Sequence, residues 1–241
     1  MNRVNRADTE EVRAFRDKRI DIICENRQLL EIPLHEGPKV ILHLLPLSSF
    51  GPLSISHADN ELTALIDNPD MLLPLSKDLF SKYYWGAEKP YIIADQFGYP
   101  DETLLNDRSP FAYLLVSGGG RIESVDSGSF IRSEKEGEQR KNILHIEDLE
   151  TEYLKAVKGR YLEILKYRLH LKPPIYLSMT LTDVKGVTVR GELSSPAGKA
   201  MMSGAYFSED CRQAGVSIDD YEEYGWLLDS VLANLRKCLE R

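Results

Sequence analysis

The feature that most restricts the fold is a short apolar run near the start of the chain, GPKVILHLLPL at residues 37–47. From Val40 to Leu47 only His43 and Pro46 are not aliphatic. A run of this length without alternation is typical of a strand buried on both faces. We therefore expect other elements to pack on both sides of a sheet. Pro46 has no N–H and should end the regular pairing.

Further strands are indicated at four places. The clearest is a hairpin at residues 110–126, PFAYLLVSGGGRIESVD, whose glycine run suits a turn because glycine adopts positive φ at little cost. Residues 175–182 alternate apolar and polar side chains, which predicts a strand with one wet face. Residues 89–95 and 187–190 predict two shorter strands.

Three helices are predicted from apolar stripes at helical spacing. They cover residues 8–25, 147–170 and 218–240. In the second, acidic residues crowd the start and basic residues the end, which complements the helix dipole. For the third, Ser217 and Asp220 have the spacing of a capping box.

Helices and strands are interleaved without strict βαβ alternation, and a hairpin is present. This predicts an α+β fold with a mixed, mostly antiparallel sheet, two long helices and an N-terminal helix. The 241 residues are expected to form a single domain over residues 1–241. A subdivision, if there is one, would fall in the charged stretch SEKEGEQRKN at residues 133–142, which we interpret as a mobile loop.

Charge and composition argue against several functions. With 30 basic and 38 acidic side chains the formal charge is −8, whereas duplex-binding modules usually carry a basic balance. No apolar run reaches the roughly 18 residues that a bilayer requires, and the start of the chain lacks the apolar centre of a signal peptide. We expect a cytoplasmic protein with no membrane partner, in which Cys24, Cys211 and Cys238 are reduced thiols.

Motifs of known chemistry are missing. There is no phosphate-binding loop, no HExxH or HxH pair and no GxSxG elbow, so no cofactor and no metal is expected. His43, inside the apolar run, is interpreted as a satisfied core residue. One catalytic alternative stays open: Asp101, Asp183 and Lys185 have the residue types of a metal-dependent nuclease, in which carboxylates hold a divalent ion beside a lysine.

Two binding features also stay open. Arg13, Arg16 and Arg19 lie on the N-terminal helix, either as a solvated charged face or as a basic strip that docks on an acidic partner. Tyr84 and Trp85, near lysines, would suit a stacking platform for single-stranded nucleic acid, or they pack in the core or an interface.

Four segments together resemble a known family. FRDKRIDII at 15–23, KVILHLLPLSSF at 39–50, YLLVSGGGRIESV at 113–125 and LKPPIYLSMTLTDVKG at 171–186 are similar to the region that follows the Schlafen AlbA-type domain of bacterial DNA-binding and ATP-binding proteins. The resemblance implies a bacterial cytoplasmic protein of regulatory or defence-related context. The family's nucleic-acid-binding domain would precede residue 1, so no binding or catalytic residue can be carried over.

The preferred hypothesis is a non-enzymatic interaction or scaffold module in a bacterial multi-component system. The resemblance implies a protein partner, such as a separately encoded AlbA-type, ATPase or nuclease subunit, and contact with nucleic acid through that partner. The alternatives are the nuclease with Asp101, Asp183 and Lys185, and a nucleic-acid-binding module that uses Tyr84, Trp85 and the basic N-terminal helix.

Overall fold

A computed structural model places most of the chain. The structure describes residues 6–25, 34, 36–50, 80–85, 92–96, 112–117, 119–127, 130–136, 139–193, 200–201, 205–212, 215–221 and 225–240.

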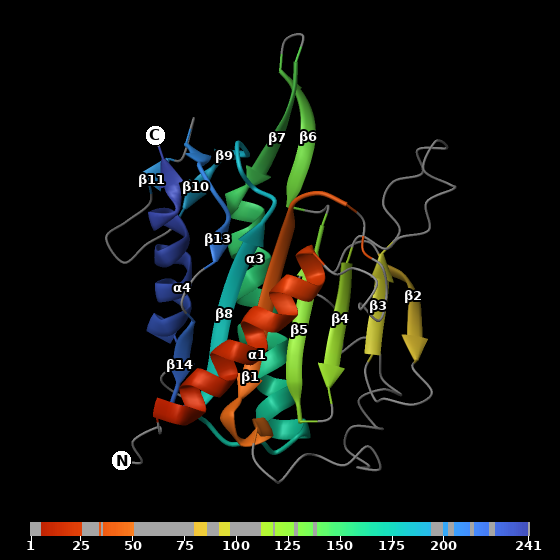
Figure 1. Ribbon diagram of the computed structural model, residues 1–241, viewed down its shortest axis with the longest axis vertical. Coiled ribbons are helices and arrows are strands. Elements are labelled where there is room, and N and C mark those ends of the chain that lie inside the picture. Colours follow the sequence, from red (N-terminus) through yellow and green to blue (C-terminus); the bar gives the residue numbers. More distant parts are fainter. Residues whose placement is uncertain are drawn as a thin grey trace.

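The larger sheet is antiparallel and is built around the apolar run (Figure 1). Its central strand, β1, pairs on one side with β5 and on the other with β8. Beyond β5 lies β4, and beyond β8 lie two short strands that each pair with it. The bounds are β1 Lys39–Pro46, β4 Ala112–Ser117, β5 Arg121–Asp126, β8 Ile175–Thr182, β13 Cys211–Arg212 and β14 Val216–Ile218. The predicted hairpin and both longer strands are thereby confirmed. The wet face expected for residues 175–182 is wrong, because every residue of β8 is buried.

Helices cover both faces of this sheet. Helix α1, Arg6–Cys24, lies on one face, and α3, Ile146–Ala156, lies on the other with two π-helical turns that follow it, η5 Val157–Tyr161 and η6 Ile164–Arg168 (Figure 1). Every residue of β1 is buried. Val40, Leu42 and Leu44 belong to the apolar cluster beneath α3, whereas Ile41 and Leu45 on the other face belong to two smaller clusters beneath α1. The prediction of a strand buried on both faces is confirmed, and the α+β class with it.

The second sheet shows that the loop predicted at residues 133–142 is wrong. Residues 133–142, expected to be a mobile loop, form most of a hairpin in which β6 pairs with β7. Strand β7 also pairs with β9, and this pair is parallel, so the strands are mixed as predicted. The order in this sheet is β15 Leu239–Glu240, β12 Tyr206–Phe207, β9 Thr188–Arg190, β7 Gln139–His145 and β6 Ile131–Glu136. The loop prediction failed because a hairpin with both faces in water has no apolar alternation.

Smaller elements complete the described part. A 3-10 turn, η2 Leu47–Phe50, follows β1, and two strand pairs stand outside the main sheets. The pairs are β2 Phe80–Trp85 with β3 Ile92–Gln96, and β10 Glu192–Leu193 with β11 Ala200–Met201. Strand β3 covers part of the predicted strand at 89–95, and β9 covers most of that at 187–190.

The C-terminal region corrects two predictions. The last helix, α4, covers Gly225–Lys237, and residues 216–218 form strand β14 instead of its first turn. Ser217 does not cap a helix, because its hydroxyl donates to Asp219. Cys211 and Cys238 are joined by a disulfide, so only Cys24 is a free thiol, and the expectation of three reduced cysteines is wrong. Among the described residues, no helix is both long and apolar enough to span a bilayer.

Candidate functional site

A buried charge cluster lies between α1 and the sheet. Its centre is Glu123 on β5, whose side chain is 5% exposed. Arg19 of α1 donates from Nε to Oε2 at 2.9 Å and from Nη2 to Oε1 at 2.7 Å. Tyr113 on β4 donates its hydroxyl to Oε1, and Nε2 of His43 on β1 lies 3.0 Å from Oε2. One carboxylate thus joins α1 to three strands.

The Glu123 carboxylate is held ionised by its neighbours. Burial alone would raise its pKa, because desolvation disfavours a charged carboxylate. Hydrogen bonds and charge from Arg19 and His43 outweigh this and hold the pKa of Glu123 well below its ordinary value. The cluster therefore anchors α1 to the sheet.

Three residue types of a hydrolase triad lie in one row across the sheet. Ser178 on β8 is opposite His43, which is opposite Glu123. However, among the described residues neither the Ser178 hydroxyl nor Nδ1 of His43 has a hydrogen-bond partner, and both residues are fully buried beneath the α1 layer. The serine is not activated by the histidine here, because a nucleophile and its base must lie within hydrogen-bond reach. The prediction of a satisfied core histidine holds for Nε2 only.

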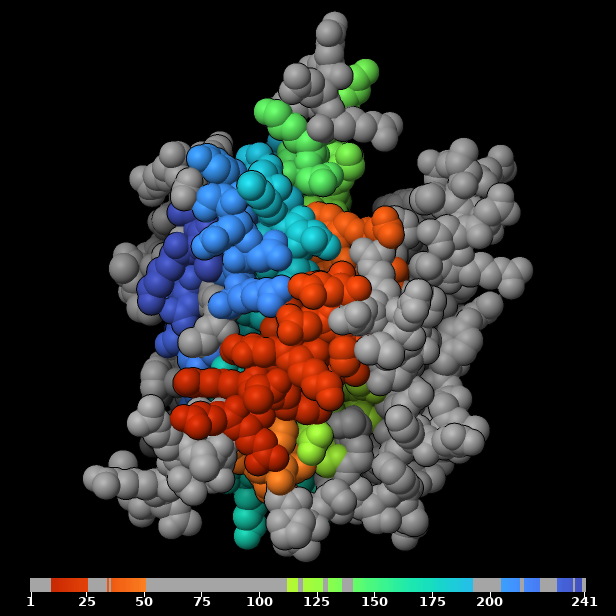
Figure 2. Space-filling view, viewed as in Figure 1, coloured from red at the N-terminus to blue at the C-terminus, as the bar shows by residue number. Residues whose placement is uncertain are grey.

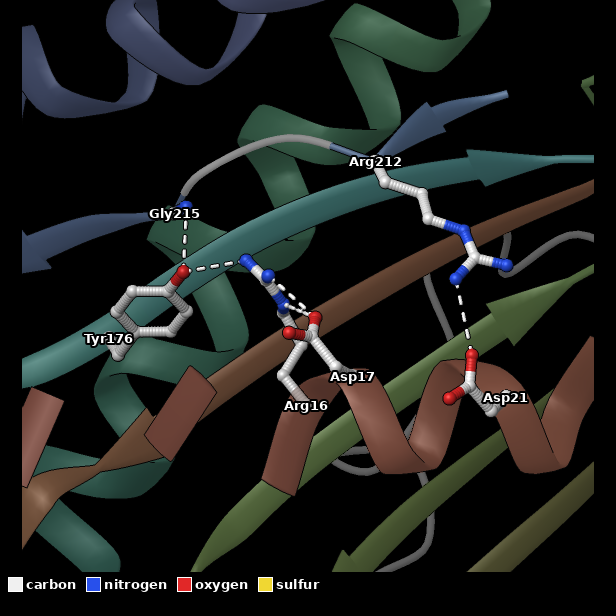
Figure 3. A network of polar contacts seen from close by, with 6 residues as sticks. All are labelled: Arg16, Asp17, Asp21, Tyr176, Arg212 and Gly215. Carbon is white, nitrogen blue, oxygen red and sulfur yellow. Dashed lines mark hydrogen bonds and ion pairs between the residues drawn. The ribbon is translucent and has the colours of Figure 1, made fainter. Parts of the chain in front are cut away.

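A second set of contacts fixes α1 to the far edge of the sheet (Figure 3). Nη1 of Arg16 donates to the Tyr176 hydroxyl at 2.7 Å, and the Gly215 backbone N–H donates to the same oxygen at 2.8 Å. Arg16 also pairs with its neighbour Asp17. A Cβ on Gly215 would lie 2.4 Å from Cζ of Tyr176, so only glycine allows this approach.

One exposed ion pair extends the same seam of contacts. Arg212 on β13 donates to Asp21 of α1 at 3.1 Å (Figure 3). Both side chains are close to half exposed, so this pair adds little to the free energy of folding. It does show that α1 reaches residues from the last third of the chain.

These contacts separate the three arginines of the predicted basic strip on α1 into one that is exposed and two that are largely buried. Arg13 is exposed, but Arg16 is 8% exposed and the Arg19 side chain 12%. For Arg16 and Arg19 the expectation of a solvated charge is wrong, because partners 160 and 104 positions away in the sequence bind them. Docking of a partner on Arg13 stays a prediction.

The other predicted site residues are only partly placed. Tyr84 and Trp85 lie in β2, opposite Ile93 and Ile92 of β3, and their side chains are outside the described part of the structure. The stacking platform therefore stays a prediction.

The nuclease candidate is placed in part as well. Asp101 lies outside the described residues, and Asp183 Oδ2 is 3.4 Å from Nζ of the buried Lys39. Lys185 is exposed and borders an open depression with Glu209, Asp210 and Arg212. Within the described ranges no three His, Cys, Asp or Glu residues gather as a metal would require.

Strands β6 and β7 form an arm that projects from the body of the protein. We call residues 131–145 the hairpin arm. Its described part extends past the ends of the neighbouring strands and stands clear of the rest of the protein in the space-filling view (Figures 1 and 2). Only its base is buried, through Ile143 and Leu144, whereas Arg132, Ser133 and Lys135 are exposed. Lys141 and Asn142 of β7 are exposed as well, so both strands of the arm present polar side chains to solvent.

One face of the hairpin arm carries a small ion network. Glu134 binds Nε2 of His145 at 2.6 Å and also pairs with Arg190 of β9. The hydrogen bond from His145, aided by Arg190, lowers the pKa of Glu134. A weaker pair, at 3.4 Å, joins Arg132 to Asp148 of α3. These contacts brace the arm against the body of the protein.

Comparison with known proteins gives no relative. No family model matches the chain, and neither the curated proteins nor the solved structures contain a significant match.

Proposed function

We propose that the protein is a non-enzymatic interaction or scaffold module, and that the hairpin arm is its contact surface. The observation that carries this proposal is the projection of a charged two-stranded arm whose outer strand, β6, is the last strand of its sheet. In the described part of the chain, no strand pairs with the outer edge of β6. Such an edge presents a row of backbone donors and acceptors to another chain.

The arm is also mechanically suited to contact. Ile143 and Leu144 fix its base in the core, and Glu134 ties β6 to β7 and β9 through His145 and Arg190. A surface that is ordered before binding loses less conformational entropy on association. The arm can therefore meet a partner without first being folded by it.

The resemblance supplies the proposed setting. The likeness to the region after an AlbA-type domain supports a bacterial regulatory or defence-related system, with a separately encoded AlbA-type, ATPase or nuclease subunit as partner. Nucleic acid would then be reached through that partner.

We also propose a cytoplasmic location. The disulfide between Cys211 and Cys238 counts against it, since cytosolic thiols are kept reduced. Alkylation of free thiols during lysis of host cells tests this point.

A site-specific cross-linker tests the interaction role. A photoreactive amino acid is placed at Lys135 on the outer strand of the arm and, as a control, at the exposed Lys158 of η5. After illumination of host cells, the probe at position 135 should give a discrete protein adduct, identified by mass spectrometry. Adducts that are no stronger at position 135 than at position 158 would refute the proposal.

A further inference from the structure

We infer that the occupant of the open β6 edge is β6 of a second copy of this chain, antiparallel and centred on Ser133. This inference rests on the proposed function, because it concerns the same hairpin arm: a second copy occupies the outer edge of β6, and the separately encoded subunit proposed above then binds the dimer at a surface other than this edge. It is carried by two independent observations: the direction in which the backbone groups of β6 point, and the order of its charges.

The ladder between β6 and β7 fixes the outward backbone groups. The N–H of His145 donates to the Phe130 carbonyl at 3.0 Å, so the pair formed by residues 130 and 145 is a hydrogen-bonded one. In an antiparallel ladder such pairs alternate with non-hydrogen-bonded ones. Residues 132 and 134 therefore turn their backbone groups toward β7. Ile131, Ser133 and Lys135 turn theirs toward the open edge.

These three residues suit a two-fold axis through Ser133. In that register, Ser133 faces Ser133 of the second copy, and Ile131 faces Lys135 of the second copy. All of these are residues with outward backbone groups, so each facing pair can exchange two hydrogen bonds across the axis. A symmetric dimer requires this kind of self-complementary surface.

The charges favour the same register over its neighbours. With the axis at Ser133, Arg132 lies opposite Glu134 of the second copy, and the reverse pair repeats this. Within one copy Arg132 also pairs with Asp148, and Glu134 with His145 and Arg190, so in the dimer each of these two side chains is shared between its own copy and the second. Both are non-hydrogen-bonded pairs, in which side chains approach most closely. An axis at residue 132 would set arginine against arginine, an axis at 134 glutamate against glutamate, and an axis at 135 lysine against lysine. Only the Ser133 register combines outward backbone groups with opposite charges.

Cysteine trapping tests the register directly. In a hydrogen-bonded pair the two Cα atoms lie about 5.5 Å apart, which is within the range of a disulfide. With Cys24 replaced by serine, Ser133→Cys should form a covalent dimer on mild oxidation of the purified chain. Lys135→Cys is the matched control, because position 135 faces Ile131 and not itself. Equal trapping at both positions, or none at 133, would overturn the inference.

Charge exchange gives a second test that does not depend on oxidation. Sedimentation should show a concentration-dependent dimer of the wild-type chain. The variant Arg132→Glu should dissociate about tenfold more readily, because two like-charge pairs replace two opposite ones. Lys158→Glu, with the same change of charge, should behave as wild type. Mixing Arg132→Glu with Glu134→Arg should restore a dimer that contains one copy of each.

Different results refute the interaction role of the hairpin arm and the self-pairing of β6. Circular dichroism checks that each variant is folded, and Ser133→Pro, which removes an outward N–H, replaces Glu134→Arg if that variant unfolds. A monomeric wild-type chain, or Arg132→Glu no weaker than Lys158→Glu, overturns self-pairing. If the photoreactive probe at Lys135 then captures a different protein, the interaction role stands without the dimer. If it captures nothing, both proposals fall.

Discussion

Neutralising the carboxylate of Glu123 should be the most damaging conservative change in the protein. Glu123→Gln keeps the shape of the side chain but replaces one charged oxygen with an amide that donates. Arg19, which is largely buried, then loses its counter-charge. Because Arg19 donates to both oxygens of Glu123, it meets the new amide donor in either orientation, together with Tyr113 at the Oε1 position or His43 at the Oε2 position. The perturbation therefore removes one partner of a buried ion pair while leaving the other in place.

The expected size of the effect follows from burial and geometry. Breaking a buried ion pair by removing one partner costs about 3–5 kcal/mol. The Arg19 side chain retains 12% exposure, so we expect the lower end, about 3 kcal/mol. For a chain of this length, that loss corresponds to a fall in Tm of roughly 6–12 °C. Glu209→Gln removes an exposed carboxylate and should stay within about 0.5 kcal/mol of wild type.

Urea denaturation followed by circular dichroism measures these free energies of unfolding. Adding Arg19→Met to Glu123→Gln should recover part of the loss, because no uncompensated charge then remains in the interface. A coupling of about 1–3 kcal/mol between the two sites is expected. The reasoning would be refuted if Glu123→Gln cost less than about 1 kcal/mol, or if the double variant were as unstable as the sum of the two single variants.

Three further predictions follow from other contacts. The pKa of Glu123 is depressed in the folded state, so its carboxylate stabilises the fold above the unfolded pKa of about 4.3, and this stabilisation is lost as the pH falls from there toward the folded pKa. The free energy of unfolding between pH 5 and pH 2 should therefore fall more steeply for wild type than for Glu123→Gln, and parallel curves would contradict this. Reducing the disulfide between Cys211 and Cys238, which are 27 positions apart, should lower the free energy of unfolding by about 3–4 kcal/mol. Thermal unfolding with and without a reductant measures this loss, and an unchanged Tm would contradict it. Gly215→Ala should lower the Tm, because its methyl group would meet the Tyr176 ring, whereas Gly159→Ala, where nothing lies within 4 Å, should not; equal Tm values would speak against the contact.

Elements with local signals could be predicted from the sequence. The hairpin of β4 and β5 has its glycine turn and its apolar arms within a few residues of each other, and β1 is apolar except at Lys39 and His43 because it is covered on both faces. The hairpin arm was missed for the opposite reason. Arg132 and Ser133 of β6, and Lys141 and Asn142 of β7, are neighbours whose side chains point to opposite faces, and all four are exposed, so the alternation of these strands carries no hydropathy signal.

The candidate site could not be predicted because its contacts are long-range. Arg16 and Arg19 are indistinguishable from solvated residues until strands 160 and 104 positions away supply Tyr176 and Glu123. Glu123 itself gave one local signal, a carboxylate among the apolar residues of the return strand. The start of α4 was misplaced for a related reason, since Val216–Ile218 pairs with β8 and its side chains alone do not show this.

The packing of α1 on the sheet has a consequence for the order in which the protein folds during synthesis. This helix is synthesised before the strands β5, β8 and β13 that anchor it, and Arg212 follows Asp21 by 191 positions. During synthesis the helix and its basic side chains therefore remain in contact with water until those strands have been made.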